Sequence, residues 1–314
     1  MSETDYGALL DEEVQAYIAR GAAFYPPDAT NLTIKEQRAV YDALCAAFHA
    51  GRPDGVQTWD ETYGGVPCRR YEAIQAENMQ TANTLIYYHG GGFVVGGLES
   101  HDDICAEIAA RAGLRVISVD YRLAPEHVFP NCYNDAKAAF DAIDATYDGA
   151  PLLAGDSAGG NLAAAVTHHV RQRVAGLVLI YPGLGGDPTA GSYVTYANAP
   201  ELTTQDMLFY KDIRLGGGEA LLGDVRFAPL QDADFSGLPR TVCITAECDP
   251  VASDSGAYCD KITAAGGSAM WFNEAGLVHG CLRARHVSQR GRAFFDRVIA
   301  AVEALKTDQM PPAD

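Results

Sequence analysis

Short apolar runs alternate with longer mixed segments along most of this chain. Each run is bounded by Gly, Pro or polar residues and has the length of a buried strand. The runs cover residues 84–88, 116–119, 150–154, 176–181, 241–246 and 269–272. Residues 56–63 and 66–73 are predicted to form an antiparallel pair that leads into the same sheet. Because strands that alternate with helical segments usually form one sheet, the pattern predicts an α/β fold with a mostly parallel central sheet flanked by helices.

Two regions lie outside this alternation. Residues 1–51 hold helical patterns over 11–21 and 34–50, and residues 183–227 hold Gly- and Pro-containing loop sequence and a predicted helix over 204–215. Long excursions of this kind are often lids over an active site. We therefore expect two lid segments, 1–51 and 183–227, and an α/β core in two parts, 52–182 and 228–314.

The turn at residues 155–159 has the sequence Gly-Asp-Ser-Ala-Gly and lies between a predicted strand and a predicted Ala-rich helix. That context is typical of a nucleophile elbow, in which a tight turn with small neighbours lifts one hydroxyl above the sheet. The helix that follows directs its N–H groups toward developing negative charge. Ser157 is therefore the candidate nucleophile, and the alternative is an ordinary strand-to-helix turn.

A glycine-rich loop follows another predicted strand. His89 precedes Gly90, Gly91 and Gly92, and consecutive glycines let a backbone turn sharply and present bare N–H groups. In an acyl-transfer site, such groups stabilise the oxyanion together with the N–H of the residue after the nucleophile. The candidate donors are Gly91, Gly92 and Ala158. A flexible loop without a role is the alternative.

The acidic partner is expected downstream of the serine. Chymotrypsin-like proteases also carry Gly-Asp-Ser, but their fold is all-β and their residues follow the order His, Asp, Ser. Asp249 is the candidate acid, because it comes just after the predicted strand 241–246. In open α/β sheets, active-site residues usually lie at the carboxyl ends of the strands. Pro250 is expected to begin the next helix at its first position. Glu247 and Asp254 are the competing acids, and Asp254 is expected to be an ordinary exposed charge.

Two of the eight histidines, His279 and His286, follow Asp249. His279 lies in a Gly-flanked segment, 274–280, which is expected to be a loop that can reach both a strand-end Asp and a neighbouring Ser. His286 falls in an Arg-rich helical stretch and is interpreted as a surface residue. His89 is expected to brace its loop, and His101 to open a helix with a polar first turn.

The chain resembles the hormone-sensitive-lipase-like carboxylesterases (bacterial family IV) of the α/β-hydrolase fold. The resemblance rests on residues 88–93 (Tyr-His-Gly-Gly-Gly-Phe), 119–126 (Val-Asp-Tyr-Arg-Leu-Ala-Pro-Glu), 155–160 (Gly-Asp-Ser-Ala-Gly-Gly) and the Asp249 and His279 segments. It implies a helical cap formed by 1–51 and 183–227, and an oxyanion hole at Gly91, Gly92 and Ala158. Cys281 departs from the family, which more often has Phe at this position. The resemblance therefore does not define the shape of the pocket near His279.

The resemblance implies a serine esterase that cleaves short- to medium-chain acyl esters with Ser157, His279 and Asp249, without a metal or another cofactor. Amides, lactones or carbamates are alternative substrates for the same three residues. A non-catalytic small-molecule receptor is a remote alternative, because such receptors usually lose the His. Family members are often dimers, so a homodimer is possible. Arg122 and Glu126 are expected to hold loops by ion pairs.

Composition narrows the choice of partners. The 314-residue chain has a formal net charge of −18, which argues against binding to nucleic acid or to anionic membranes. No apolar run approaches the roughly 20 residues of a membrane-spanning helix. The first residues show no secretory signal, and the eight cysteines lack metal-like spacing. We therefore expect a cytoplasmic protein with reduced thiols.

Overall fold

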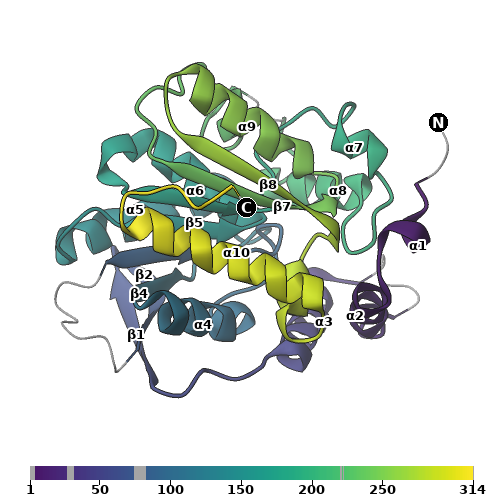
Figure 1. The fold of residues 1–314 in the computed structure, drawn as a ribbon. Coiled ribbons are helices and arrows are strands. Elements are labelled where there is room, and N and C mark those ends of the chain that lie inside the picture. Colours follow the sequence, from purple (N-terminus) through teal and green to yellow (C-terminus); the bar gives the residue numbers. More distant parts are fainter. Residues whose placement is uncertain (1–3, 27–31, 74–82, 220, 222, 314) are drawn as a thin grey trace.

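A mixed sheet runs through the middle of the molecule (Figure 1). The structure is a computed structural model that describes residues 4–26, 32–73, 83–219, 221 and 223–313. Within those residues the sheet has eight strands in the order β1-β2-β4-β3-β5-β6-β7-β8. The β1–β2 and β2–β4 pairs are antiparallel and the other pairs are parallel. The strands are β1 (Val56–Tyr63), β2 (Val66–Ala73), β3 (Thr84–Tyr88), β4 (Arg115–Val119), β5 (Leu152–Asp156), β6 (Gly176–Ile180), β7 (Thr241–Cys248) and β8 (Ala269–Val278).

Helices cover both faces of the sheet. One face packs against α4 (Asp102–Ala112) and α10 (Gln289–Lys306), and the other packs against α5 (Asn131–Thr146), α6 (Ala158–Val170) and α9 (Ala252–Ala264). The other described α-helices are α1 (Tyr6–Leu9), α2 (Glu12–Ala22), α3 (Ile34–Phe48), α7 (Ser192–Thr195) and α8 (Thr204–Leu215). The described 3₁₀ helices are η3 (Glu99–His101), η4 (Arg171–Arg173), η5 (Pro229–Gln231) and η6 (Cys281–His286).

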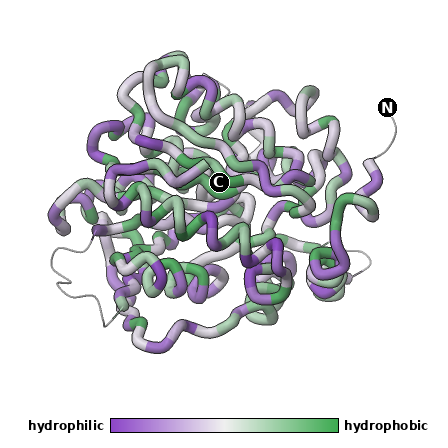
Figure 2. Tube along the Cα trace, viewed as in Figure 1, coloured by the Kyte–Doolittle hydropathy of each residue, from purple (hydrophilic) through white to green (hydrophobic). Residues whose placement is uncertain are grey.

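This double cover explains why the strands are continuously apolar. Successive side chains of a strand point to opposite faces, so a strand covered on both faces needs apolar residues at every position. In β3, Leu85 and Tyr87 belong to the core under α4 and α10, whereas Ile86 and Tyr88 belong to the core under α5, α6 and α9. Figure 2 shows hydrophobic residues along the central strands.

Three of the described helices outside the α/β alternation, α2, α3 and α8, begin at capping residues. Asp11 accepts a hydrogen bond from the Val14 N–H at the start of α2. Thr33 with Glu36 forms a capping box at the start of α3, and Thr203 with Asp206 does so at α8. Each cap satisfies backbone donors that the helix itself leaves free. The predicted helices over 11–21, 34–50 and 204–215 are confirmed to within one or two residues.

Two boundaries near the candidate site differ from the prediction. Strand β8 continues to Val278, so residues 274–278 are strand and His279 follows the strand directly. β8 is an edge strand, where polar Asn273 and Glu274 are tolerated because one side of the strand meets solvent. Helix α9 begins at Ala252, two residues after Pro250, so Pro250 does not occupy the first helical position.

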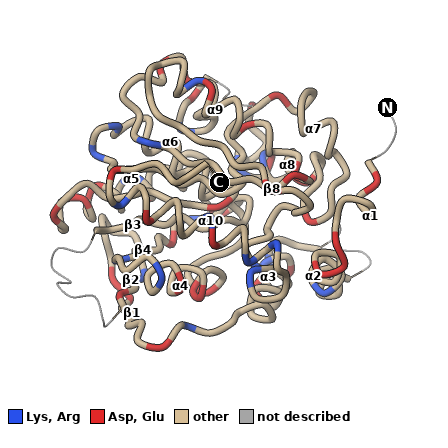
Figure 3. The backbone as a smooth tube through the Cα atoms, in the orientation of Figure 1, with Lys and Arg blue, Asp and Glu red and all other residues tan. Residues whose placement is uncertain are grey.

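Charged residues are spread over the outer elements. Figure 3 shows Asp and Glu distributed around the molecule, with Lys and Arg between them. The excess of 41 acidic over 23 basic residues therefore gives the protein a generally acidic exterior. Among the described residues, no helix is long and apolar enough to cross a membrane, and no cluster of side chains is suited to hold a metal ion.

Candidate active site

Ser157 lies in the sharp turn between β5 and α6. Its backbone has φ +52° and ψ −115°, a region that residues other than glycine rarely adopt. The flanking glycines are needed because the chains approach closely: a Cβ on Gly159 would lie 1.9 Å from the Tyr88 carbonyl oxygen, and one on Gly155 would lie 2.4 Å from the Gly159 carbonyl carbon. The small residues of the turn therefore permit the strained conformation that presents the Ser157 side chain.

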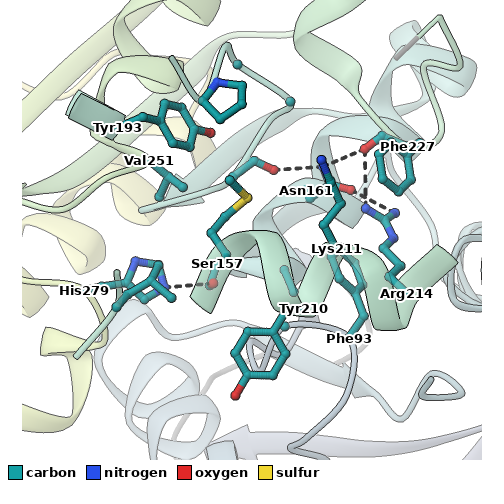
Figure 4. A pocket seen from close by; sticks show the side chains of 18 residues that line it. Phe93, Ser157, Asn161, Tyr193, Tyr210, Lys211, Arg214, Phe227, Val251 and His279 are labelled. Atoms are coloured by element: carbon teal, nitrogen blue, oxygen red, sulfur yellow. Dashed lines mark hydrogen bonds between the residues drawn. The ribbon is translucent and has the colours of Figure 1, made fainter. Parts of the chain in front are cut away.

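The structure brings Ser157, His279 and Asp249 together from the carboxyl ends of β5, β8 and β7. The His279 Nε2 atom lies 2.9 Å from the Ser157 Oγ atom (Figure 4). The His279 Nδ1 atom lies 2.7 Å from Asp249 Oδ2. Asp249 is fully buried, and its Oδ1 accepts a hydrogen bond of 3.0 Å from the Val251 N–H. The three side chains form one hydrogen-bonded chain with His279 in the middle. Along the sequence they follow the predicted order Ser, Asp, His.

The two competing acids have other partners. The Glu247 carboxylate accepts a hydrogen bond of 2.8 Å from the Gly276 N–H. Asp254 is buried and accepts hydrogen bonds from the backbone N–H groups of Leu184 and Gly186 and from the Tyr193 hydroxyl. The interpretation of Asp254 as an exposed charge is therefore wrong: it holds the loop after β6. Its burial raises the pKa of its carboxyl to about 6.

Two opposing influences act on the pKa of His279. Burial disfavours the charged imidazolium, but the charge of the Asp249 carboxylate and its hydrogen bond outweigh burial. Asp156 and Glu201 act in the same direction as Asp249, so the pKa of His279 lies above its ordinary value. The imidazole is thus poised to accept a proton near neutral pH.

The glycine loop lies beside the turn that holds Ser157. Gly91 has φ +121° and Gly92 has φ +59°, and a Cβ on Gly91 would lie 2.1 Å from the Val95 carbonyl oxygen. Within the described residues, the N–H groups of these two glycines donate no hydrogen bond. The loop therefore offers free donors next to the serine, as an oxyanion site requires.

A buried network joins this loop to the turn. The Asp156 carboxylate accepts hydrogen bonds from the Gly90 N–H at 2.9 Å and from the Tyr87 hydroxyl at 2.8 Å, and its Oδ2 lies 3.2 Å from His101 Nε2. Burial opposes the charge of Asp156, but His101 and Tyr87 overcome that effect and hold its pKa well below the usual range. The prediction that His101 only opens a helix missed this contact, which no local sequence pattern signals.

The predicted structural ion pairs are present. The Arg122 guanidinium binds Asp135 on α5 at 2.6 Å, and Glu126 binds Arg38 on α3 at 2.7 Å. His89 is fully buried and stacks on the Tyr121 ring at 4.3 Å, in agreement with a bracing role. His286 is partly exposed and binds Glu107 at 3.0 Å. These contacts tie α3, α4 and α5 to the loops behind the site.

Two cavities meet at Ser157 and His279. The apolar cavity, of about 190 Å³, is walled by Tyr193, Met207, Phe227 and Val251 among others (Figure 4). The tyrosine-lined cavity, of about 150 Å³, is walled by Tyr17, Tyr25, Tyr41, Glu201 and Arg283 among others. Helices from outside the α/β alternation contribute to these walls, with α2 and α3 on the tyrosine side and α8 on both.

Cys281 does not line either cavity. Its side chain is fully buried in the core with the α10 residues, whereas its neighbours Gly280 and Leu282 line the tyrosine-lined cavity. Cys248 is also fully buried, and burial raises the pKa of its thiol to about 11. Cys281 thus packs in the core behind the site, and its neighbours form the cavity wall.

Comparisons with known proteins agree with this geometry. The family model described as "alpha/beta hydrolase fold" matches residues 85–283. The carboxylesterase NlhH of Mycobacterium tuberculosis is 36% identical over 258 residues, which cover 75% of this chain and 79% of that protein. A second match is the solved structure of the ester hydrolase EH1AB1 from the metagenome of Lake Arreo, in complex with a bipyridine phosphonate derivative. The two chains are 32% identical and superpose with a TM-score of 0.85. The match covers 94% of this chain and 99% of that chain.

A further solved structure connects the chain to a named subgroup. An esterase from the bacterial hormone-sensitive lipase family is 26% identical, has a TM-score of 0.82 and covers 93% of this chain and 98% of its own. The sheet order, the Ser-His contact and these matches over most of the chain agree with one another. The chain therefore belongs to the hormone-sensitive-lipase-like carboxylesterases of the α/β-hydrolase family.

Proposed function

We propose that this protein hydrolyses short- to medium-chain acyl esters with Ser157 as nucleophile, His279 as general base and acid, and Asp249 as the residue that orients His279. The observation that carries the proposal is the position of His279, which bridges Ser157 at 2.9 Å and Asp249 at 2.7 Å. A serine hydroxyl needs such a base, because it is a weak nucleophile while protonated.

In the first half of the reaction, the Ser157 oxygen attacks the ester carbonyl carbon while His279 Nε2 takes the hydroxyl proton. Asp249 accepts a hydrogen bond from the His279 Nδ1–H group and stabilises the imidazolium. The N–H groups of Gly91, Gly92 and Ala158 bind the oxyanion. When the C–O bond of the ester breaks, His279 returns the proton to the leaving alcohol, and an acyl-enzyme remains.

In the second half, water attacks the acyl-enzyme and the same groups act again. His279 takes a proton from the water and then gives it to the Ser157 oxygen as the acid product leaves. Loss of one oxyanion donor typically lowers turnover by about 100- to 1000-fold. All steps use side chains and backbone groups of this chain.

The size and position of the cavities support a small acyl group. A cavity of about 190 Å³ beside Ser157 suits a short or medium chain. We propose that residues 1–51 and 183–227 form a cap, because Tyr17 and Tyr41 of the first segment and Tyr210 of the second meet in one cavity wall. A homodimer through the edge strand β8 stays a prediction, supported by the exposed Trp271 on that strand.

The direct test is hydrolysis of p-nitrophenyl esters from acetate to palmitate by the wild type beside Ser157→Ala. We expect the highest kcat/KM at short chains and no turnover above background by the variant. Ser255→Ala, a buried serine on α9, is the matched control and should keep the activity. Activity that survives in Ser157→Ala would refute the nucleophile, and a maximum at palmitate would refute the acyl preference.

A further inference from the structure

Arg214, near the end of α8, is a buried cation in the wall of the apolar cavity. Its residue exposure is 3%, and it lines the same cavity as Ser157 and His279. The sequence gives no hint of this, since a charged residue at the end of a lid helix is usually solvated. Figure 4 shows its guanidinium facing Asn161 and the Phe227 backbone, on the α6 side of the cavity.

The protein satisfies the hydrogen-bond donors of this guanidinium poorly. The guanidinium donates long hydrogen bonds to neutral acceptors: 3.2 Å to the Asn161 side-chain oxygen, and 3.4 Å to each of the Phe227 and Arg226 carbonyl oxygens. Its Nε atom has no hydrogen-bond partner among the described residues, and no described carboxylate lies within ion-pair distance of it. A buried charge without a counter-ion is costly, which makes this arrangement unusual.

Aromatic rings provide further contacts of this cation, and the Cys132 side chain and the charge of Asp224 also act on it. The Arg214 guanidinium carbon lies 3.6 Å from the centre of the Phe93 ring, 4.5 Å from that of Phe227 and 5.3 Å from that of Phe129. Such contacts hold the side chain in place without neutralising it. Burial lowers the pKa of Arg214, yet a guanidinium stays charged at neutral pH. The result is a fixed, water-poor positive charge.

The other described residues that line this cavity do not offset the charge of Arg214. Lys211, one turn earlier on α8, also lines the cavity, and no Asp or Glu is among the described lining residues. The charge of the cavity wall is thus opposite to that of the whole chain, which has 41 acidic and 23 basic residues. Asp254 lies behind the wall, but its carboxylate is occupied by the Leu184 and Gly186 N–H groups and the Tyr193 hydroxyl.

We propose that the apolar cavity binds an ester that also carries an ionised carboxylate group, and that Arg214 is the counter-ion of this carboxylate. This inference rests on the proposed function. Ser157 and Arg214 line the same cavity, and Asn161, which accepts a hydrogen bond from Arg214, follows Ser157 by four residues. The carboxylate belongs either to the acyl group, as in a half-ester of a dicarboxylic acid, or to the alcohol.

The test compares each charged ester with a neutral ester of the same shape. Benzyl hydrogen glutarate is matched by benzyl pentanoate, and 4-acetoxybutanoate is matched by butyl acetate. We expect wild-type kcat/KM to be about 10- to 100-fold higher for one charged ester than for its neutral match, because a hydrogen-bonded charge pair favours binding by that factor. The first pair reports an acyl carboxylate and the second an alcohol carboxylate.

Three variants assign the preference to Arg214. Arg214→Met keeps the length of the side chain and should abolish the preference while neutral esters are still cleaved, and Arg214→Lys should retain part of it. Arg226→Met is the matched control, because Arg226 lies in the adjacent loop, pairs with Asp224 and does not line the cavity. It should leave the preference unchanged.

A wild-type measurement covers the case in which Arg214→Met does not fold. Glutaramate, which carries one carboxylate, should inhibit cleavage of benzyl pentanoate at a concentration about tenfold lower than neutral pentanamide does. If neutral esters are cleaved but neither charged ester is preferred and glutaramate inhibits no better than pentanamide, the inference is overturned and the proposed function stands. A preference that persists in Arg214→Met also overturns it. If the wild type cleaves no ester of either kind, the proposed function itself fails.

Discussion

The Asp156 carboxylate accepts a hydrogen bond of 2.9 Å from the backbone N–H of Gly90. This bond joins the residue before the proposed nucleophile to the loop that carries the proposed oxyanion donors Gly91 and Gly92. Both ends of the bond are buried, so water does not compete with it. The serine and the oxyanion loop are thereby held as one unit, although 66 residues separate the bonded groups along the chain.

The first prediction concerns this link. Asp156→Ala leaves the Gly90 N–H and the Tyr87 hydroxyl without an acceptor, and the loop loses its position relative to Ser157. We expect kcat to fall by about 100-fold with little change in KM, as for loss of one oxyanion donor. We also expect the free energy of unfolding to fall by about 3 kcal/mol, since buried polar partners are left unpaired.

Asp156→Asn is the control for that prediction. Its side-chain oxygen can still accept the Gly90 bond while the charge is lost, so kcat should recover to within about tenfold of wild type. Steady-state kinetics and urea denaturation measure both effects. A kcat in Asp156→Ala equal to that of the wild type would show that the link does not position the site.

The second prediction concerns pH. The proposed mechanism needs neutral His279, and its pKa lies above the ordinary value because Asp249, Asp156 and Glu201 favour the imidazolium. Activity should therefore be lost as the pH falls through a midpoint above about 6.5. Rate–pH profiles of kcat/KM for a short-chain ester measure this midpoint.

Glu201→Gln tests one cause of that pKa. Glu201 lines the tyrosine-lined cavity with His279, and loss of water around its carboxyl raises its own pKa to about 7. Removal of its charge should move the acid midpoint of the rate profile down by roughly 0.5 pH unit, as expected for a partly screened charge pair. Glu303→Gln, an exposed change on α10, is the control. A midpoint that rises in Glu201→Gln would contradict the assignment.

The third prediction is steric. Gly159→Ala places a Cβ 1.9 Å from the Tyr88 carbonyl oxygen, and neither backbone segment can move without disturbing β3 or α6. We expect a loss of stability of about 3–5 kcal/mol, or no folded protein, because overpacking at a buried backbone contact is costly. Gly223→Ala meets no atom within 4 Å and should unfold at the wild-type temperature. Thermal unfolding of both variants measures the difference, and equal stabilities would refute the prediction.

The fourth prediction concerns the thiols. All eight cysteines are buried and unpaired, and burial raises the pKa of Cys248 to about 11 and holds that of Cys281 well above its usual range. Because the thiolate is the reactive form, native protein should keep its esterase activity in iodoacetamide at pH 7.5. A thiol titration should find eight reactive groups only after denaturation. Rapid inactivation of the native enzyme would contradict this prediction.

Local sequence patterns were sufficient for much of the fold. The alternation of apolar runs and helices predicts the sheet, because a strand covered on both faces must be apolar at every position. Strands β1, β2 and β3 and helix α8 have the predicted bounds. The turn around Ser157 and the glycine loop are also local, since each depends on small residues within a few positions. The order Ser, Asp, His then follows from the fold class.

Long-range contacts decided the rest. The sequence favoured Asp249 over Glu247 and Asp254, but only the approach of β7 to the residue after β8 pairs Asp249 with His279. His101 and Arg214 look like ordinary exposed residues in sequence, yet both are buried against segments distant in the chain. Spacing along a helix or strand determines which face a side chain occupies. Tertiary packing determines which residues cover that face, and it therefore also determines the charge and the pKa values of the site.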